Sequence, residues 1–176
     1  ILSENGSLKI NKFEDLKSKQ KDSITRKFSD FLKGLWFEQY VFDILKSHFS
    51  NKYKISLNDF VYNDKFEDKD QKFEMDISII NSYQLIGISC TTSEYKDLCK
   101  SKAFEIIQRT KQIGGDEAKA ILINFMDQKT NDRIMESLNM DTGSLDKKFL
   151  VLGKENLKQE ILVEKIKSFI EGDYND

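Results

Sequence analysis

The chain has 176 residues, of which 39% are hydrophobic and 11% aromatic, enough to bury one core but too few to expect two. Charged residues make up 33%, yet the net charge is only -2, which excludes a global basic field for nucleic acid. No apolar run approaches the roughly 20 residues of a membrane span, and Cys90 and Cys99 lack the spacing of a zinc site or a disulfide framework. We expect one domain in the reducing cytoplasm, with any anion-binding surface confined to a local patch.

The chain begins with residues rich in Lys, Asp, Glu, Ser and Asn, and residues 1–22 predict a linker or arm. Residues 23–176 are expected to form the single domain. Because the chain starts at Ile1 and not at Met, we expect it to be the C-terminal part of a longer protein. A first helix is predicted from Ser23, a plausible N-cap, because apolar residues then recur at steps of about three and four: Phe28, Phe31, Leu35, Phe42, Leu45 and Phe49.

The middle and the end of the chain alternate between strand and helix patterns. A weak strand at 58–61 and a charged turn at 63–71 precede two strands, at 73–80 and 84–90, that are expected to form a hairpin. A helix at 97–113 should end at Gly114-Gly115, because glycine suits a C-cap with positive φ. The remaining predicted elements are a strand at 120–125, a short helix at 131–138, a strand at 148–152 and a closing helix at 156–170. This order predicts an α/β fold with a mixed central sheet flanked by helices.

Acidic residues stand out in two of these elements. Glu38 falls within the apolar stripe of the first helix, where a buried carboxylate is costly without a partner. In the strand at 73–80, Phe73, Met75, Ile77 and Ile79 alternate onto one face, which places Glu74, Asp76 and Ser78 on the other. Oxygen ligands on rigid elements suit Mg²⁺ or Mn²⁺. Both features have a plainer explanation, a carboxylate at the edge of the stripe and a solvated strand face.

Polar residues of the helix at 97–113 form one stripe, while Ala103, Phe104, Ile106 and Ile107 mark its buried side. Lys102 could orient a water and stabilise charge on a phosphate, and Arg109 could hold a phosphate oxygen. An ordinary face of paired Lys and Glu side chains explains the stripe equally well. Other chemistries have less support, because His48 has no serine or cysteine assigned to it and is interpreted as a surface residue.

Three segments together resemble the PD-(D/E)XK nuclease superfamily, which has the restriction-endonuclease-like fold. They are Gly34-Leu-Trp-Phe-Glu38-Gln-Tyr-Val, Phe73-Glu-Met-Asp76-Ile and Leu85-Ile-Gly-Ile-Ser-Cys-Thr. More narrowly, the run from Lys100 through Lys102, Glu105 and Arg109 to Gly114-Gly-Asp-Glu-Ala118 resembles the nuclease domains of CRISPR ancillary effectors. The similarity covers about residues 30–152. It implies a metal-dependent endonuclease of DNA or RNA that acts in antiviral defence.

The resemblance also implies roles for residues. Asp76 and Glu38 would bind Mg²⁺ or Mn²⁺, but Ser89 and Thr91 stand where the family has a carboxylate and a lysine. The lysine is then expected from the next helix, as Lys102 with Lys100 as second choice, and Glu105 would replace the carboxylate. Lys100 and Arg109 are the expected nucleic-acid contacts.

Partners follow from the same resemblance. It implies a homodimer, with an N-terminal CARF domain that senses cyclic oligoadenylate in the full-length protein. The alternative is a catalytically inactive domain for nucleic-acid binding or dimerisation.

Overall fold

The computed structural model describes residues 34–62, 72–143, 145 and 147–172. The chain divides into two compact units, Ile1–Trp36 and Phe37–Asp176, and the second contains all five described strands. The predicted arm at 1–22, the helix start at Ser23 and the charged turn at 63–71 lie outside the described residues.

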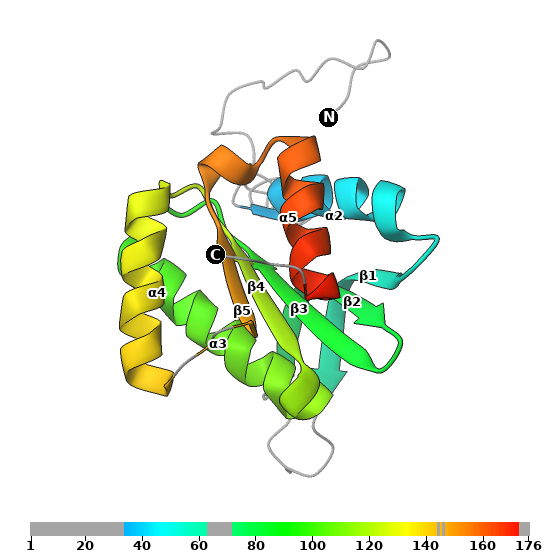
Figure 1. Ribbon diagram of the computed structural model, residues 1–176, viewed down its shortest axis with the longest axis horizontal. Helices are drawn as coiled ribbons and strands as arrows, with labels where there is room; N and C mark the ends of the chain where they lie inside the picture. The colour runs from blue at the N-terminus through cyan, green and yellow to red at the C-terminus, as the bar shows by residue number, and fades with distance from the viewer. Residues whose placement is uncertain (1–33, 63–71, 144, 146, 173–176) are drawn as a thin grey trace, which may run out of the picture. The chain divides into compact units, whose positions relative to one another are not determined.

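The centre of the unit is a five-stranded mixed sheet in the order β1-β2-β3-β4-β5 (Figure 1). The first three strands run antiparallel, and β4 and β5 run parallel to β3. The weak strand predicted at 58–61 is part of a longer β1. The strand bounds are Lys54–Tyr62 for β1, Lys72–Asn81 for β2, Gln84–Cys90 for β3, Lys119–Ile123 for β4 and Phe149–Leu152 for β5.

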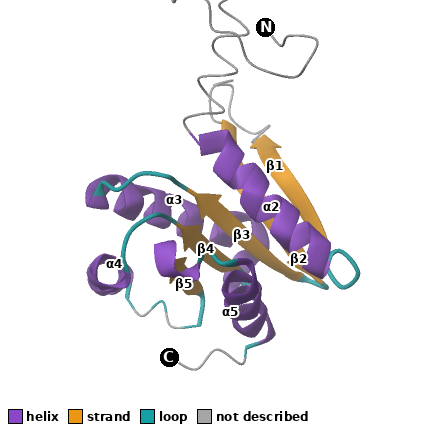
Figure 2. Ribbon diagram, turned by 90° about the horizontal axis from the view of Figure 1, so that it is seen from above, coloured by secondary structure: helices purple, strands orange, loops and turns teal. Residues whose placement is uncertain are grey.

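Helices cover both faces of this sheet (Figure 2). One core cluster joins α2 and α5 to one face, and a second joins α3 and α4 to the other. The predicted α/β class, a mixed central sheet flanked by helices, is therefore confirmed. The helices are α2 (Trp36–Phe49), α3 (Lys96–Gly114), α4 (Gln128–Thr142) and α5 (Gln159–Glu171), with short 3-10 turns η3 (Gly115–Glu117) and η4 (Lys154–Asn156).

The buried side of α2 differs from the predicted stripe. Phe37, Val41 and Leu45 are almost fully buried, whereas Leu35 is 39% exposed and Phe42 is only half-buried. The four-residue steps from Phe37 to Leu45 set the face that packs on the sheet, because residues four apart lie on one side of a helix. Glu38 sits at the edge of this face and is partly buried.

The strand alternation predicted for β2 breaks at Asp76. Ile77 and Ile79 pack in the cluster with α2 and α5, but Met75 packs on the opposite face with Cys99 and Ala103 of α3. The expected shared face of Met75, Ile77 and Ile79 is therefore wrong for Met75. The break coincides with Asn58 on the neighbouring strand, which has a left-handed backbone at φ 54 and is not paired with Asp76, although the register of β1 with β2 is the same on both sides.

Three helix predictions also need correction. Phe104, expected on the buried side of α3, is 42% exposed. The predicted short helix at 131–138 is a longer α4, because Asp127 caps it by accepting a hydrogen bond from the backbone N–H of Thr130. The predicted closing helix at 156–170 starts later, since η4 occupies the residues before α5. The expected C-cap of α3 is confirmed, with Gly115 at φ 70.

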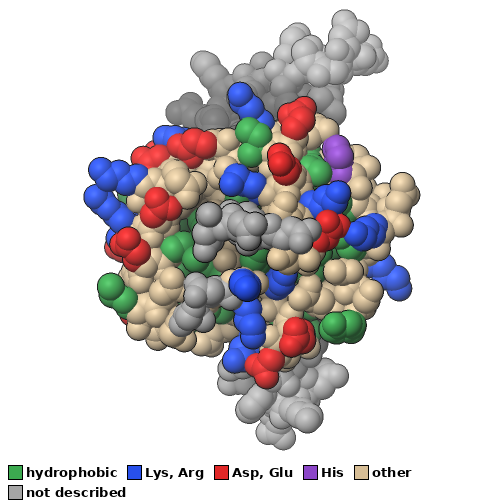
Figure 3. All heavy atoms as spheres, viewed as in Figure 1, with side chains coloured by type: hydrophobic (Ala, Val, Ile, Leu, Met, Phe, Trp, Pro, Cys, Tyr) green, Lys and Arg blue, Asp and Glu red, His purple; other side chains and the backbone are tan. Residues whose placement is uncertain are grey.

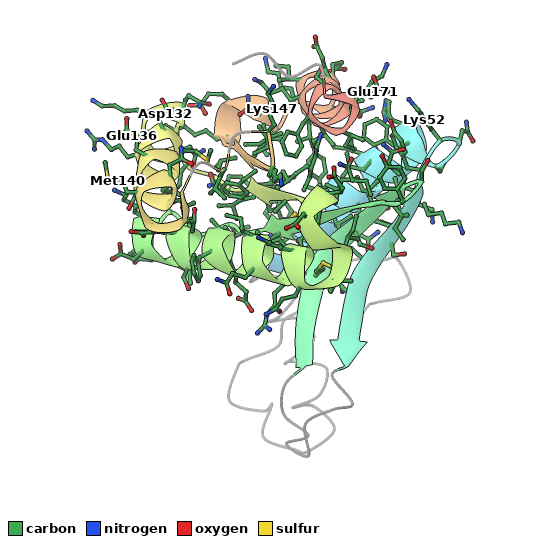
Figure 4. The ribbon with its side chains drawn as sticks, turned by 60° about the horizontal axis from the view of Figure 1, so that its bottom comes forward. Lys52, Asp132, Glu136, Met140, Lys147 and Glu171 are labelled. Atoms are coloured by element: carbon green, nitrogen blue, oxygen red, sulfur yellow. The ribbon has the colours of Figure 1, made fainter. Side chains whose placement is uncertain are left out.

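The C-terminal helix is tied back to the start of the sheet. Lys52, which follows α2, forms an ion pair of 2.6 Å with Glu171 at the end of α5, and both are labelled in Figure 4. Among the described residues, no helix has the length and apolar character that crossing a membrane requires.

Candidate active site

Asp76 lies where β2 and β3 stop pairing. The last paired residues are Ile77 and Ile88, so Asp76 comes directly opposite Ser89. The backbone N–H of Cys90 donates a 2.6 Å hydrogen bond to Asp76 Oδ2, and the Ser89 hydroxyl donates one of 3.1 Å to the same oxygen. The Asp76 side chain thus takes the place of a ladder bond and is fixed at the carboxyl end of β3.

The surroundings of Asp76 are mixed in charge. Burial raises the pKa of its carboxyl group above the ordinary value. The Cys90 N–H, the Lys102 ammonium group and the Ser89 hydroxyl oppose this rise, and the negative charge of Glu105 adds to it. Lys102 and Glu105 therefore lie close enough to Asp76 to act on its ionisation.

Lys102 and Glu105 come from α3, which packs closely over β3 at Gly87. A Cβ built at Gly87 would lie 2.2 Å from Thr110 Oγ1 and 3.2 Å from Ile106 Cδ1. Such contacts are far shorter than van der Waals distances, so only glycine lets the helix approach this closely. Because Gly87 has no side chain, α3 occupies the space above β3 at this point.

Glu38 reaches the same end of the sheet from α2. The pKa of the Cys90 thiol is raised well above its ordinary value, chiefly by burial and then by the charges of Asp76 and Glu38, while Lys102 lowers it. The structure therefore brings four predicted residues from α2, β2 and α3 around the end of β3. They are Glu38, Asp76, Lys102 and Glu105, and we call them the Asp76 cluster.

The two positions without the expected carboxylate and lysine have local partners. The Ser89 side chain is bonded to Asp76, as described above. Thr91 is 7% exposed, and its hydroxyl accepts a hydrogen bond of 3.2 Å from the backbone N–H of Ser93. Its own N–H donates to the carbonyl of Ile123 in β4. Thr91 thus stabilises the turn that leads from β3 to α3.

The two predicted nucleic-acid contacts are not both near Asp76. Lys100 points to α4, where its ammonium group lies 2.7 Å from Asp141 Oδ2 and donates to the Ser137 hydroxyl. Arg109 lies two turns beyond Lys102 on α3, half-buried, and donates to Gln112 Oε1 at 3.3 Å. Lys100 is thereby engaged between helices, whereas Arg109 continues the polar stripe of Lys102.

The carboxylates of the cluster are of the ligand type that a hard divalent cation prefers. Mg²⁺ is commonly held by one or two carboxylates and keeps several waters. Both hydrogen bonds to Asp76 end on Oδ2, and Glu38 and Glu105 add carboxylates nearby. In the described ranges no three His, Cys, Asp or Glu side chains are grouped so that they could hold a metal ion. A cation bound at Asp76 would therefore need further ligands from water and substrate.

A network of buried asparagines beside the cluster was missed from the sequence. Asn124, at the end of β4, is 0% exposed and donates to Asn131 Oδ1 in α4 at 2.9 Å. Asn156 accepts from the backbone N–H of Gly153 after β5. These bonds fix the loops at the carboxyl ends of both strands. The signal was an asparagine directly after an apolar strand, which favours a turn.

On the face in Figure 3, Lys and Arg side chains are interspersed with Asp and Glu. A hollow of about 180 Å³ lies at the other end of α3, beside the start of β4. The three lysines that line it have partners within the protein. Lys119 donates to the carbonyl of Phe169, Lys148 donates to that of Asp116, and Lys111 forms an ion pair of 3.5 Å with the Asp116 carboxylate.

Comparison with known proteins places the fold. No protein-family model matches the chain, and no curated protein matches it. The protein VC1899 from Vibrio cholerae superposes with a TM-score of 0.62 at 21% identity, over 87% of this chain and 37% of that one. Can2 from Sulfobacillus thermosulfidooxidans, solved with cyclic tetra-adenylate, gives 0.57 at 17%, over 90% and 46%.

A third structure is more distant. The small subunit of the heterodimeric restriction endonuclease R.BspD6I gives a TM-score of 0.47 at 14% identity, over 80% of this chain and 72% of that one. The chain spans less than half the length of VC1899 and of Can2. At these identities the likeness concerns the fold.

Proposed function

We propose that this domain is a metal-dependent endonuclease that hydrolyses phosphodiester bonds of DNA or RNA. The observation that carries the proposal is the Asp76 cluster. A partly buried carboxylate has a lysine and a second carboxylate on α3 within electrostatic reach, and Glu38 of α2 acts on the neighbouring Cys90. Carboxylates beside a cation at a strand end supply both metal ligands and a group that handles phosphate charge.

Asp76 and Glu38 would hold Mg²⁺ or Mn²⁺, with Glu105 as a supporting ligand. When bound, the cation supplies a water of lowered pKa and neutralises charge on the phosphate. Burial of Asp76 keeps bulk water from one side of the site, and the Ser89 and Cys90 donors hold its carboxylate in one orientation. The ligands are thus placed by rigid elements before any substrate arrives.

Lys102 would take the role of the catalytic lysine, because Thr91 occupies the position at which the resembled family has that lysine. The Lys102 ammonium group opposes the rise in the pKa of Asp76, so its positive charge lies within electrostatic range of that carboxylate. A lysine in this place orients the attacking water by hydrogen bonding and offsets the charge that develops on the phosphate. Arg109, further along α3, would hold a neighbouring phosphate oxygen.

The whole-protein context is also part of the proposal. Can2 was solved with cyclic tetra-adenylate, and this chain covers 46% of it. By analogy, a CARF domain that senses cyclic oligoadenylate would precede this domain, and a cytoplasmic homodimer would place two nuclease sites together. Regulation by such a ligand would then act on the Asp76 cluster from outside the unit.

The test is cleavage of supercoiled plasmid and of single-stranded RNA, with Mn²⁺, Mg²⁺ or EDTA, in the longest form of the protein with cyclic tetra-adenylate. We expect cutting that needs the cation and is lost in Asp76→Ala. Cutting that survives this substitution would reject the proposed site.

A second function has one observation in its favour. Ser89 and Thr91 each have a structural partner, so neither replaces the missing carboxylate or lysine. A domain of this fold without those groups could bind nucleic acid or mediate dimerisation without cutting. Binding of a labelled oligonucleotide together with no cleavage under any of the conditions above would establish this alternative.

A further inference from the structure

Of the two hydrogen-bond donors to Asp76, a substitution can remove one but not the other. The N–H of Cys90 belongs to the backbone and is present with almost any residue at that position. The other donor is the hydroxyl of Ser89, the side chain that donates a hydrogen bond to Asp76 among the described residues. Ser89 is 8% exposed, so a water has little access to replace the hydroxyl.

Both donors meet the same oxygen of Asp76. Oδ2 accepts two hydrogen bonds, which orient the carboxylate plane, and from the described residues Oδ1 accepts none. An oxygen without a protein donor is the better ligand for a cation, because its lone pairs are available. Two donors on one oxygen therefore direct the other oxygen of the same carboxylate toward a ligand.

The place of Ser89 in the sheet explains why it can do this. It lies opposite Asp76, one step beyond the last paired residues of β2 and β3. Side chains directly opposite each other in an antiparallel pair lie close together. Pairing of β2 with β3 ends at this point and Met75 packs against α3, so the bond to the Cys90 N–H is made by the Asp76 side chain.

We propose that Ser89 is a positioning residue, which binds no cation itself but fixes Asp76 so that Oδ1 faces a Mg²⁺ or Mn²⁺ ion. This inference rests on the proposed function. Groups that orient a metal ligand typically change metal affinity about ten- to a hundredfold when they are removed. The position at which the resembled family has a carboxylate ligand thus contributes through Asp76 instead.

The experiment measures Mn²⁺ affinity of the whole chain, without substrate, from the electron paramagnetic resonance signal of free Mn²⁺. Ser89→Ala should bind Mn²⁺ at least about tenfold more weakly than the wild type. Ser89→Thr, which keeps the hydroxyl, should recover most of the affinity. The matched control is Ser78→Ala, which removes another buried hydroxyl from the same sheet and should leave the affinity unchanged.

A further variant guards against a folding defect. Ser89→Cys nearly keeps the side-chain size but offers only a weak donor, so it should bind Mn²⁺ more weakly while unfolding at the wild-type temperature. Wild-type affinity in both Ser89→Ala and Ser89→Cys would overturn the positioning role.

Asp76→Asn separates this failure from failure of the proposed function. Loss of Mn²⁺ binding in Asp76→Asn with unchanged binding in both Ser89 variants rejects the positioning role and keeps the metal site. Equal binding by the wild type and Asp76→Asn, or no binding by the wild type, rejects both.

Discussion

The ammonium group of Lys100 lies 2.7 Å from Oδ2 of Asp141, and this ion pair ties α3 to α4. Lys102, two residues further along, acts on Asp76 instead. The two lysines point to different neighbours because two residues correspond to a rotation of roughly 200° about a helix. One helix therefore separates a structural lysine from the lysine proposed for the reaction.

This separation predicts different effects for two similar substitutions. Lys102→Ala should lower the rate of metal-dependent cleavage about a hundredfold or more, because the charge beside the phosphate is lost. Lys100→Ala should cut at nearly the wild-type rate and lose at most about 1 kcal/mol of stability, since its ion pair is partly exposed. Plasmid-cleavage rates and urea unfolding of both variants give the comparison. Equal loss of cleavage in both would assign the reaction to the helix face as a whole and remove the special role of Lys102.

Asp76 should limit stability at neutral pH. Its pKa is raised in the folded state, chiefly by burial, so the folded protein holds that proton more tightly than the unfolded chain. The resulting stabilisation is complete below the unfolded-state pKa and is lost as the pH rises through the raised folded pKa. In EDTA near pH 7, Asp76→Asn should therefore be more stable than the wild type, because asparagine stays neutral. Its gain should shrink as the pH falls and the wild-type carboxyl becomes protonated.

The measurement is the free energy of unfolding in urea between about pH 3 and about pH 8. Asp132→Asn is the control, because Asp132 is an exposed acid on α4 whose carboxylate accepts a hydrogen bond from Gln128 (Figure 4). Asp132→Asn should show no such pH-dependent gain. A neutral-pH stability of Asp76→Asn at or below that of the wild type would contradict the burial argument.

Ser89→Glu should make the stability of the domain depend on the cation. A second carboxylate next to Asp76 repels it when no cation is present, and like charges at a buried site are costly. We expect a lower unfolding temperature in EDTA, by several degrees, and recovery with Mn²⁺. Ser89→Gln has a similar size without the charge and is the matched control. The same loss for both variants, with no effect of Mn²⁺, would show that size alone is responsible.

The sheet and its helices were predictable because their signals are local. The alternation of β3, the three- and four-residue spacing of α3 and the glycine pair after it predict elements whose ends fall within a few residues of those observed. The outer edges were less accurate. Asp127, one residue before α4, caps a helix that begins three residues earlier than its apolar pattern suggests.

The residues of the Asp76 cluster could be predicted from the sequence, but their arrangement in space could not. Alternation alone placed Met75 on the wrong face, because it does not reveal the break at Asp76, which coincides with a left-handed residue, Asn58, on another strand. Lys102 was preferred over Lys100, but the ion pair of Lys100 was not predictable, since its partner Asp141 lies 41 residues away in the chain. Such long-range contacts exist only after the chain has folded.

The position of α3 over the sheet depends on Gly87. A Cβ at Gly87 would overlap Thr110 Oγ1 at 2.2 Å and crowd Met75 Sδ at 3.1 Å. Gly87→Ala should therefore destabilise the domain by about 1–3 kcal/mol, the usual cost of overpacking. It should also reduce cleavage, since pushing α3 from the sheet moves Lys102 away from Asp76.

A second substitution tests whether the overlap is the cause. Thr110 Oγ1 is buried without a hydrogen-bond partner among the described residues, so Thr110→Ala removes the clashing atom and breaks no hydrogen bond seen there. In the double variant the cost of Gly87→Ala should fall by more than half, which is a coupling measurable in a double-mutant cycle. Simple additivity of the two costs would mean that the overlap with Thr110 is not the cause. The cost of Gly87→Ala would then come from its contacts with Met75 and Ile106.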